Sequence, residues 1–307
     1  MAKLTPYELK AALARGLLAF PLTDFDTSDA LDTNASARRL EWLASYRPAT
    51  FFMAAGAGEF FSLTAQEYAA LVGSAVKLRT GGIPIVGAAG YGTRMAVAYA
   101  QDSERLGADG LLLLPPYLTE APQQGLRAHI EAVCKATRLA VIVYNRANCR
   151  LQADTLARLA EACPNLIGFK DGIGDTEQLM SIRAGLGDRL VYLNGMPTAE
   201  TYARAFAIQG FASYSSAIFN FVPRMAIEVH RAVYAADAAA FARFERDFLI
   251  PYVRIRSRQP GYAVSIVKAG ATIVGRSAGK VRPPLSELTP SEHEELRALI
   301  AKLGDQV

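Results

Sequence analysis

Eight short apolar runs alternate with amphipathic segments along most of the chain. They are four to six residues long and lie at residues 17–20, 50–54, 83–88, 110–114, 139–144, 166–170, 190–193 and 211–214. Apolar runs of this length are typical of strands that are covered on both faces. The segments between them repeat apolar residues at helical spacing. Several begin with a helix-capping residue, such as Thr64 or Asp154.

Strict alternation of strands and helices over residues 1–220 predicts parallel strands joined by right-handed crossovers. Eight such repeats fit a closed α/β barrel, the (β/α)8 or TIM barrel, here with an additional N-terminal helix. The alternative is an open doubly wound sheet. It is less favoured because neither a GxGxxG motif nor a P-loop follows any of the strands.

Residues 221–307 are mostly helical in pattern and lack further strand candidates. Helices are predicted at residues 221–235, 237–257, 262–275 and 291–303. We therefore expect a C-terminal helical extension that packs on the flank of the barrel and has no obvious chemistry of its own.

Composition excludes several classes of protein. The chain has 307 residues, a formal net charge of only +4 and 51% hydrophobic residues, without a basic motif interleaved with stacking aromatics, so nucleic-acid binding is not expected. No apolar run reaches the roughly 18 residues of a membrane span. The three cysteines lie at no metal-ligand spacing, and the first residues lack a secretion-signal pattern. These features predict a cytoplasmic protein with reduced thiols.

The strongest candidate chemistry lies at the ends of two neighbouring predicted strands. Lys170 ends one apolar run and Tyr144 ends the preceding one. An ammonium group is costly to bury, so a lysine in this position tends to lose its proton and become a nucleophile. A tyrosine beside it can move the protons that amine chemistry requires. The pair predicts an enzyme that forms a Schiff base with a carbonyl substrate.

Other polar residues near predicted strand ends are candidates for substrate binding. Arg146 can pair with a substrate carboxylate, or instead with Asp171 or Glu59. Asn148 lies in the same loop as Arg146. At the end of the last predicted strand, a pair of serine hydroxyls can donate to a substrate carboxylate or hydroxyl; these are Ser213 and Ser215.

Two further groups of polar residues favour structural roles. Glu59 is expected to accept backbone amides at a helix start rather than to act in catalysis. The three histidines lie in helical segments away from the strand ends and are expected to be surface or packing residues; they are His129, His230 and His293.

The chain resembles the lysine-dependent class I superfamily of dihydrodipicolinate synthase and N-acetylneuraminate lyase. The Gly-Phe-Lys-Asp piece at residues 168–171 is shared by that superfamily. Other pieces resemble its 5-dehydro-4-deoxyglucarate dehydratase branch, and the resemblance extends over essentially the whole chain. These pieces include Tyr144-Asn-Arg146, Phe60-Phe-Ser-Leu63, Gly195-Met-Pro-Thr-Ala-Glu200, Tyr214-Ser-Ser-Ala-Ile-Phe-Asn-Phe-Val-Pro223 and Gly261-Tyr-Ala-Val-Ser-Ile-Val-Lys268.

The resemblance implies a specific reaction on a small-molecule keto sugar diacid. Lys170 is implied to form the Schiff base, with Tyr144 as the acid and base. Loss of water and of carbon dioxide from 5-dehydro-4-deoxy-D-glucarate then gives 2,5-dioxopentanoate. No metal or organic cofactor is implied, because the iminium is the electron sink. The family also implies a homodimer or homotetramer, in which Tyr117 is a candidate contact between subunits.

The chain departs from the family at several positions that bear on the substrate. Ala57 replaces a threonine expected to hold the carboxylate beside the ketone, and this loss costs roughly 1.5–3 kcal/mol unless it is replaced. Backbone amides of Ala57 and Gly58 can still serve that carboxylate. Leu118 and Cys149 replace a tyrosine and an arginine of the synthases, which argues against that activity. Gly195 lets the backbone approach the substrate, but Asn194 before it hints at altered specificity.

Two alternatives therefore remain open. One is a related aldolase or sugar-acid dehydratase that acts on another 2-keto acid. The other is a weakened paralogue that binds keto acids without turning them over.

Overall fold

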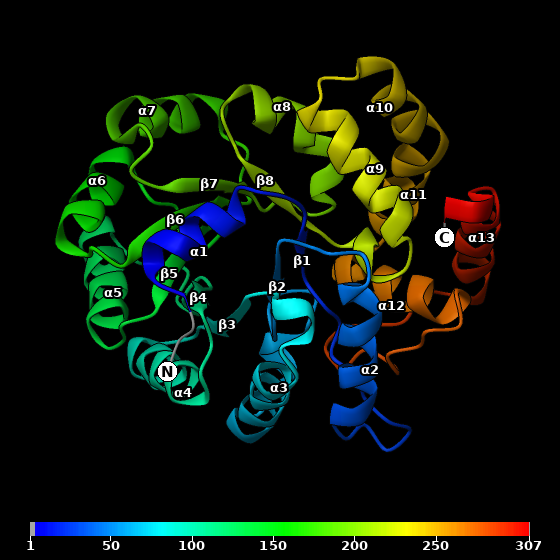
Figure 1. Ribbon diagram of the computed structural model, residues 1–307, viewed down its shortest axis with the longest axis horizontal. Helices are drawn as coiled ribbons and strands as arrows, with labels where there is room; N and C mark the ends of the chain where they lie inside the picture. The colour runs from blue at the N-terminus through cyan, green and yellow to red at the C-terminus, as the bar shows by residue number, and fades with distance from the viewer. Residues whose placement is uncertain (1–3, 307) are drawn as a thin grey trace.

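The computed structural model describes residues 4–306 and contains a closed barrel of eight parallel strands (Figure 1). The predicted (β/α)8 barrel is therefore confirmed. Each strand pairs with the next along the chain, and the first pairs with the last to close the barrel. The strands are β1 (Leu18–Ala19), β2 (Thr50–Phe52), β3 (Ile85–Ala89), β4 (Gly110–Leu113), β5 (Ala140–Asn145), β6 (Leu166–Asp171), β7 (Val191–Asn194) and β8 (Ser213–Ser216).

A ring of helices covers the outside of the barrel (Figure 1). The helices before and within the barrel repeats are α1 (Pro6–Leu13), α2 (Thr33–Ala44), α3 (Ala65–Leu78), α4 (Thr93–Leu106), α5 (Gln123–Lys135), α6 (Ala153–Ala162), α7 (Thr176–Leu186) and α8 (Ala203–Ile208). Capping boxes open α1 and α3, with Thr5 and Thr64 as the capping residues. Short 3-10 turns include η1 (Phe60–Ser62), η3 (Ala199–Tyr202) and η4 (Ile218–Asn220). No helix among residues 4–306 is long and apolar enough to cross a membrane.

The interior of the barrel is filled from one end by α1, which lies across the amino-terminal ends of the strands (Figure 1). Leu9 and Leu13 of this helix are fully buried among the inward-facing strand residues. Gly110 of β4 has no side chain because Leu9 occupies that space. With one end closed by packing, the carboxyl ends of the strands are left to form a site.

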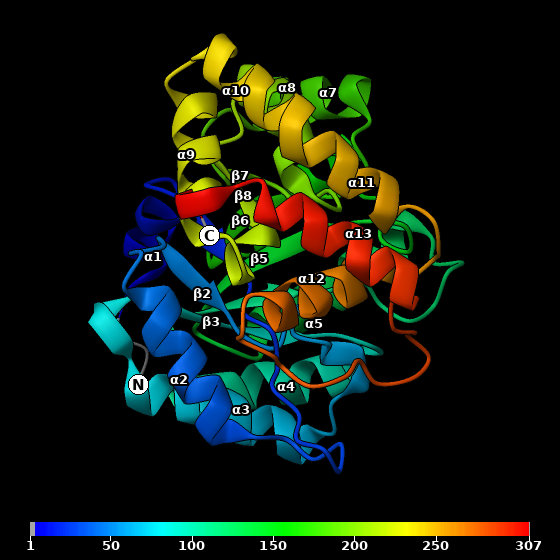
Figure 2. The same cartoon turned by 90° about the vertical axis from the view of Figure 1, so that its right-hand side faces the viewer.

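The C-terminal extension lies along one side of the barrel (Figure 2). It contains α9 (Pro223–Tyr234), α10 (Ala238–Phe244), α11 (Ile250–Arg256), α12 (Tyr262–Ile273) and α13 (Pro290–Ala301). A five-residue π-helical segment, Glu245–Leu249, joins α10 to α11, so residues 238–256 are continuously helical, much as the sequence predicted. The predicted division at residue 220 falls between η4 and α9.

A buried ion pair joins this extension to the barrel. Lys268 of α12 lies 2.7 Å from the carboxylate of Glu59, and both side chains are buried. The Glu59 carboxylate also accepts the backbone amide of Arg282. The expectation that Glu59 caps a helix start is wrong, because its side chain makes no capping bond to η1 and turns to the extension instead.

Candidate active site

A cavity of about 280 Å³ lies at the carboxyl ends of the strands. Residues from β4, β5, β6 and β8 and from the segments after β1, β2 and β7 contribute to it, and α12 of the extension contributes two. The lining residues are Phe20, Gly56, Ala57, Phe61, Leu112, Leu114, Tyr144, Arg146, Lys170, Gly195, Met196, Pro197, Thr198, Ser215, Ser216, Ala217, Ala263 and Val264.

Lys170 is the buried lysine of this cavity. Its side chain is directed inward from β6 opposite Tyr144 of β5, and its Nζ lies 3.7 Å from the centre of the Tyr144 ring and 5.2 Å from that of Phe20. Within residues 4–306, Nζ has neither a hydrogen-bond partner nor a carboxylate in ion-pair contact. Burial lowers the pKa of Lys170 well below its ordinary value, Arg146 lowers it further, and only Asp171 opposes this. Such an amine is available as a nucleophile near neutral pH.

Tyr144 connects Lys170 to two other groups. Its hydroxyl donates to the carbonyl oxygen of Gly195 at 2.7 Å and accepts from Nη1 of Arg146 at 2.9 Å. Burial raises the pKa of Tyr144, and the charge and hydrogen bond of Arg146 act against this rise. The phenol is thus protonated at neutral pH, and a cation stabilises its anion when a proton moves.

Two glycines make room for this pair. A Cβ at Gly195 would lie 2.5 Å from Nζ of Lys170, and one at Gly172 would lie 2.8 Å from the hydroxyl of Tyr144. Neither position tolerates a side chain without moving a reactive group. Gly195 therefore serves the site both by its missing side chain and by its carbonyl oxygen.

Asp171 lies behind the cavity and organises its loops. One carboxylate oxygen accepts from Asn145 at 2.6 Å, and the other accepts the amides of Ile173 and Gly174. The carbonyl of the Asn145 side chain in turn accepts the amide of Leu151 at 2.8 Å. This network fixes the loops after β5 and β6, the strands that carry the reactive pair. For Arg146, the structure shows a hydrogen bond to Tyr144 and no ion pair with Asp171 or Glu59.

The turn after β2 presents free backbone amides. Within the described residues, the amides of Ala57 and Gly58 have no hydrogen-bond partner, whereas the carbonyl of Gly58 accepts the hydroxyl of Thr23 at 2.6 Å. Consecutive free amides of this kind bind anionic oxygens. Ala57 lines the cavity, and the next residue, Gly58, is buried and does not line it.

The structure does not bring every predicted residue to the cavity. Ser215 lines it, but Ser213 begins β8 rather than ending it and donates to the carbonyl of Gly16 at 2.6 Å, at the opposite end of the barrel. The prediction placed the strand about two residues too early. Asn148 lies in the tight turn between Arg146 and Cys149 and does not line the cavity.

Several lining residues were not predicted from the sequence. Phe61 and Phe20 come from loops and strand ends that carry no polar signal. Thr198 has a φ of 52°, unusual for a β-branched residue; it lies in the family piece at residues 195–200 but was not named as a site residue. Ala263 and Val264 also line the cavity, although the extension was expected to have no obvious chemistry of its own.

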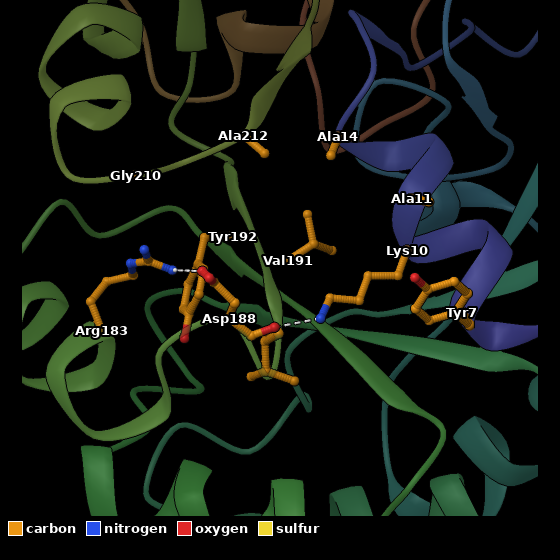
Figure 3. A pocket seen from close by; sticks show the side chains of 11 residues that line it. Tyr7, Lys10, Ala11, Ala14, Arg183, Asp188, Val191, Tyr192, Gly210 and Ala212 are labelled. Carbon is orange, nitrogen blue, oxygen red and sulfur yellow. Dashed lines mark hydrogen bonds and ion pairs between the residues drawn. The ribbon is translucent and has the colours of Figure 1, made fainter.

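A second cavity, of about 320 Å³, lies at the other end of the barrel between α1 and the starts of β7 and β8 (Figure 3). Its two cations are already satisfied by the protein. Lys10 donates to the carbonyls of Asp188 and Arg189, and Arg183 pairs with the Asp188 carboxylate. This cavity contains none of the predicted site residues, so the cavity around Lys170 is the candidate active site.

Comparison with known proteins gives consistent results. Residues 13–303 match the model of the dihydrodipicolinate synthetase family. The chain is 54% identical over 303 residues to a 5-dehydro-4-deoxyglucarate dehydratase of Pseudomonas putida, covering 99% of this chain and 100% of that protein. It is 53% identical, with the same coverage, to a probable 5-dehydro-4-deoxyglucarate dehydratase of Azotobacter vinelandii.

Solved structures of lower identity share the fold. Dihydrodipicolinate synthase from Oceanobacillus iheyensis superposes with a TM-score of 0.89 at 20% identity, covering 97% of this chain and 99% of that one. The synthase from Bacillus clausii gives 0.88 at 22% identity, covering 96% and 99%.

Proposed function

The chain belongs to the dihydrodipicolinate synthetase family, and we propose that it dehydrates and decarboxylates 5-dehydro-4-deoxy-D-glucarate to 2,5-dioxopentanoate through a Schiff base on Lys170. The observation that carries the proposal is the pairing of a buried lysine that lacks an anionic partner with a tyrosine at 3.7 Å. High identity to the dehydratases over nearly the full chain supports the choice of substrate.

The chemistry follows from the iminium. The amine of Lys170 attacks the ketone carbon, and loss of water gives the iminium. Loss of a proton from the neighbouring methylene gives an enamine, which expels the β-hydroxyl as water and leaves a conjugated iminium. The distal carboxylate then departs as carbon dioxide, and its bonding electrons pass into this conjugated system. Protonation of the carbon chain gives an enol that tautomerises to the aldehyde, and hydrolysis of the iminium then releases 2,5-dioxopentanoate and free Lys170.

Tyr144 is proposed to carry the protons. Its hydroxyl is held between the Gly195 carbonyl and the Arg146 guanidinium, at the edge of the space that the imine would occupy. It can protonate the departing hydroxyl of the carbinolamine, and Arg146 stabilises the phenolate that results. Arg146 also adds positive charge to a cavity that takes a dianionic substrate.

The carboxylate next to the ketone is proposed to bind the free amides of Ala57 and Gly58. Backbone donors need no side chain, so the loss of the family threonine at Ala57 removes one hydrogen bond without removing the site. Ser215, which lines the same cavity, is a further donor for the substrate.

We also propose that the enzyme is a homodimer or homotetramer of the cytoplasm. Tyr117 and Leu118, after β4, are 82% and 58% exposed, and apolar side chains this exposed favour a subunit contact. The cysteines are free and buried, consistent with a reducing compartment. Sedimentation of the wild type and of Tyr117→Ser/Leu118→Ser should show dissociation in the double variant.

Two measurements test the reaction. Incubation with pyruvate and borohydride should add one reduced adduct, located on Lys170 by peptide mass spectrometry. Incubation with 5-dehydro-4-deoxy-D-glucarate should release one carbon dioxide per 2,5-dioxopentanoate formed. An adduct without carbon dioxide release would favour an aldolase or another dehydratase, and no adduct with any 2-keto acid would refute the Schiff base.

A further inference from the structure

The amino-terminal end of α12 opens onto the cavity around Lys170. Ala263 and Val264, in the first turn of this twelve-residue helix, both line that cavity. The residue before the helix is Gly261, so no side chain caps it. Within residues 4–306, the backbone amide of Ala263 has no hydrogen-bond partner. A free amide at a helix amino terminus carries partial positive charge and favours an anion.

Thr198 gives independent evidence that a ligand binds in this cavity. It lines the same cavity, is only 6% exposed, and its hydroxyl has no hydrogen-bond partner among the described residues. Because this hydroxyl of a largely buried side chain has no partner in the protein, it is free to bond a group that enters the cavity. The left-handed backbone at φ 52° is costly for a threonine, and strain of this kind is concentrated at functional sites.

We infer that the amide of Ala263 and the hydroxyl of Thr198 form the subsite for the distal carboxylate of a keto sugar diacid. The inference rests on the proposed function, which already supplies groups for the rest of the substrate. Lys170 takes the ketone, and the amides of Ala57 and Gly58 take the carboxylate beside it. The second carboxylate therefore needs donors elsewhere on the wall.

Such a subsite also suits the loss of carbon dioxide. A guanidinium ion pair would stabilise the carboxylate in the ground state and hinder its departure. A helix terminus and a hydroxyl carry only partial charge. They orient the group without the full stabilisation of an ion pair, and the apolar neighbours Pro197 and Val264 suit the neutral product.

The decisive variants place a competing charge at this helix end. Ala263 is exposed, and an aspartate in the first turn is compatible with the helix, so Ala263→Asp should fold. It should raise KM for 5-dehydro-4-deoxy-D-glucarate about tenfold or more, because its carboxylate occupies the subsite and repels the distal carboxylate of the substrate. The isosteric Ala263→Asn should cause a much smaller rise. Gln259→Glu adds the same charge outside the cavity and should behave as wild type.

Thr198 is tested by a matched pair. Thr198→Val keeps the shape and β-branching but removes the hydroxyl, and should raise KM for the diacid about fivefold. Thr198→Ser keeps the hydroxyl and should restore most of the affinity. Equal effects of the valine and serine variants would exclude a hydrogen-bonding role.

Pyruvate separates this inference from the proposed function, because it forms the imine but has no distal carboxylate. Borohydride trapping of pyruvate on Lys170 should proceed at similar rates in wild type, Ala263→Asp and Thr198→Val. A trapping rate that falls as much as diacid turnover would overturn the subsite, as would equal KM values for Ala263→Asp and Ala263→Asn. If the wild type itself forms no pyruvate adduct, it is the proposed function that fails.

Discussion

Two lysines are buried among residues 4–306, and their surroundings differ in one respect. Lys170 and Lys268 are 3% and 1% exposed, and the Nζ of each lies over an aromatic ring. Lys268 pairs with the Glu59 carboxylate at 2.7 Å and donates to the carbonyl of Lys280. Lys170 has neither kind of partner and faces the phenol of Tyr144 instead.

Burial lowers the pKa of both amines, so burial alone does not mark the reactive one. Around Lys268 the Glu59 carboxylate opposes the effect of burial, whereas around Lys170 the nearby Arg146 reinforces it. A buried lysine with a carboxylate in contact is part of the scaffold. One deprived of that contact, beside a proton donor and an open cavity, is available for covalent chemistry.

The largest expected effect is that of removing the unpaired amine. Lys170→Met should abolish the pyruvate adduct and lower turnover by about 10⁴-fold or more. Its melting temperature should be unchanged or higher, because no buried partner is left unsatisfied. Borohydride trapping, steady-state kinetics and circular-dichroism melting measure the three quantities. An adduct that persists on Lys268 would break the comparison.

Removing the proton donor beside Lys170 should have the next largest effect. Tyr144→Phe should lower turnover by about 10²–10⁴-fold while the fold is retained, because the phenyl ring keeps the packing and loses the acid. Steady-state kinetics give the change. Tyr46→Phe, outside the cavity, is the control and should keep wild-type turnover.

Removing Lys268, the lysine paired with Glu59, should affect stability rather than imine formation. Lys268→Met leaves Glu59 buried without its cation and should lower the free energy of unfolding by about 3–5 kcal/mol, measured by urea denaturation. Pyruvate trapping on Lys170 should persist in the folded variant. The double variant Lys268→Met/Glu59→Gln should recover part of the loss, and a failure to recover would argue that the lysine acts through packing alone.

A buried carboxylate without a cation extends the comparison. Glu200 accepts from the Ser216 hydroxyl at 2.6 Å, and burial raises its pKa to about 7. When folding raises the pKa of a carboxyl group, the group adds its full stabilisation below the pKa of the unfolded state. This stabilisation is lost as pH rises through the pKa of the folded state. Between pH 5 and pH 8.5 the free energy of unfolding of the wild type should therefore fall by up to about 3 kcal/mol more than that of Glu200→Gln. Urea unfolding midpoints that change equally with pH in the two proteins would contradict this.

The smallest effect is expected from removing Arg146, the cation that lowers the pKa of Lys170 in addition to burial. Arg146→Met should raise the Lys170 pKa and shift the acidic limb of the trapping-rate profile upward by about one pH unit. Trapping of pyruvate should then be slower at pH 6–7 and recover near pH 9. Arg94→Met, at an exposed position, should leave the profile unchanged. A profile that shifts downward would reverse the sign assigned to Arg146.

Local sequence signals were sufficient for the barrel and for its reactive pair. Strands covered on both faces must be apolar, so all eight were found, most within one or two residues of their observed bounds. Lys170 and Tyr144 were recognisable because polar residues that end apolar runs are uncommon. Tyr144 and Lys170 lie side by side because β5 pairs with β6.

Contacts between distant parts of the chain could not be predicted in the same way. Glu59 was expected at a helix cap because nothing near it in sequence reveals Lys268. Ala263 carries its contribution in the backbone, which has no residue signature. Ser213 was misplaced because an error of two residues in a strand preserves the inward face but moves the side chain to another layer of the barrel.

The Glu59–Lys268 pair has a consequence for the way the protein is made. Glu59 leaves the ribosome long before Lys268 is added, so each nascent barrel holds a carboxylate whose counter-ion does not yet exist. Until α12 is synthesised, that carboxylate lacks its ion-pair partner, and the turn after β2 lacks the contact that buries it. We therefore expect the turn after β2, whose amides are proposed to bind the substrate, to take its final position only after α12 has docked.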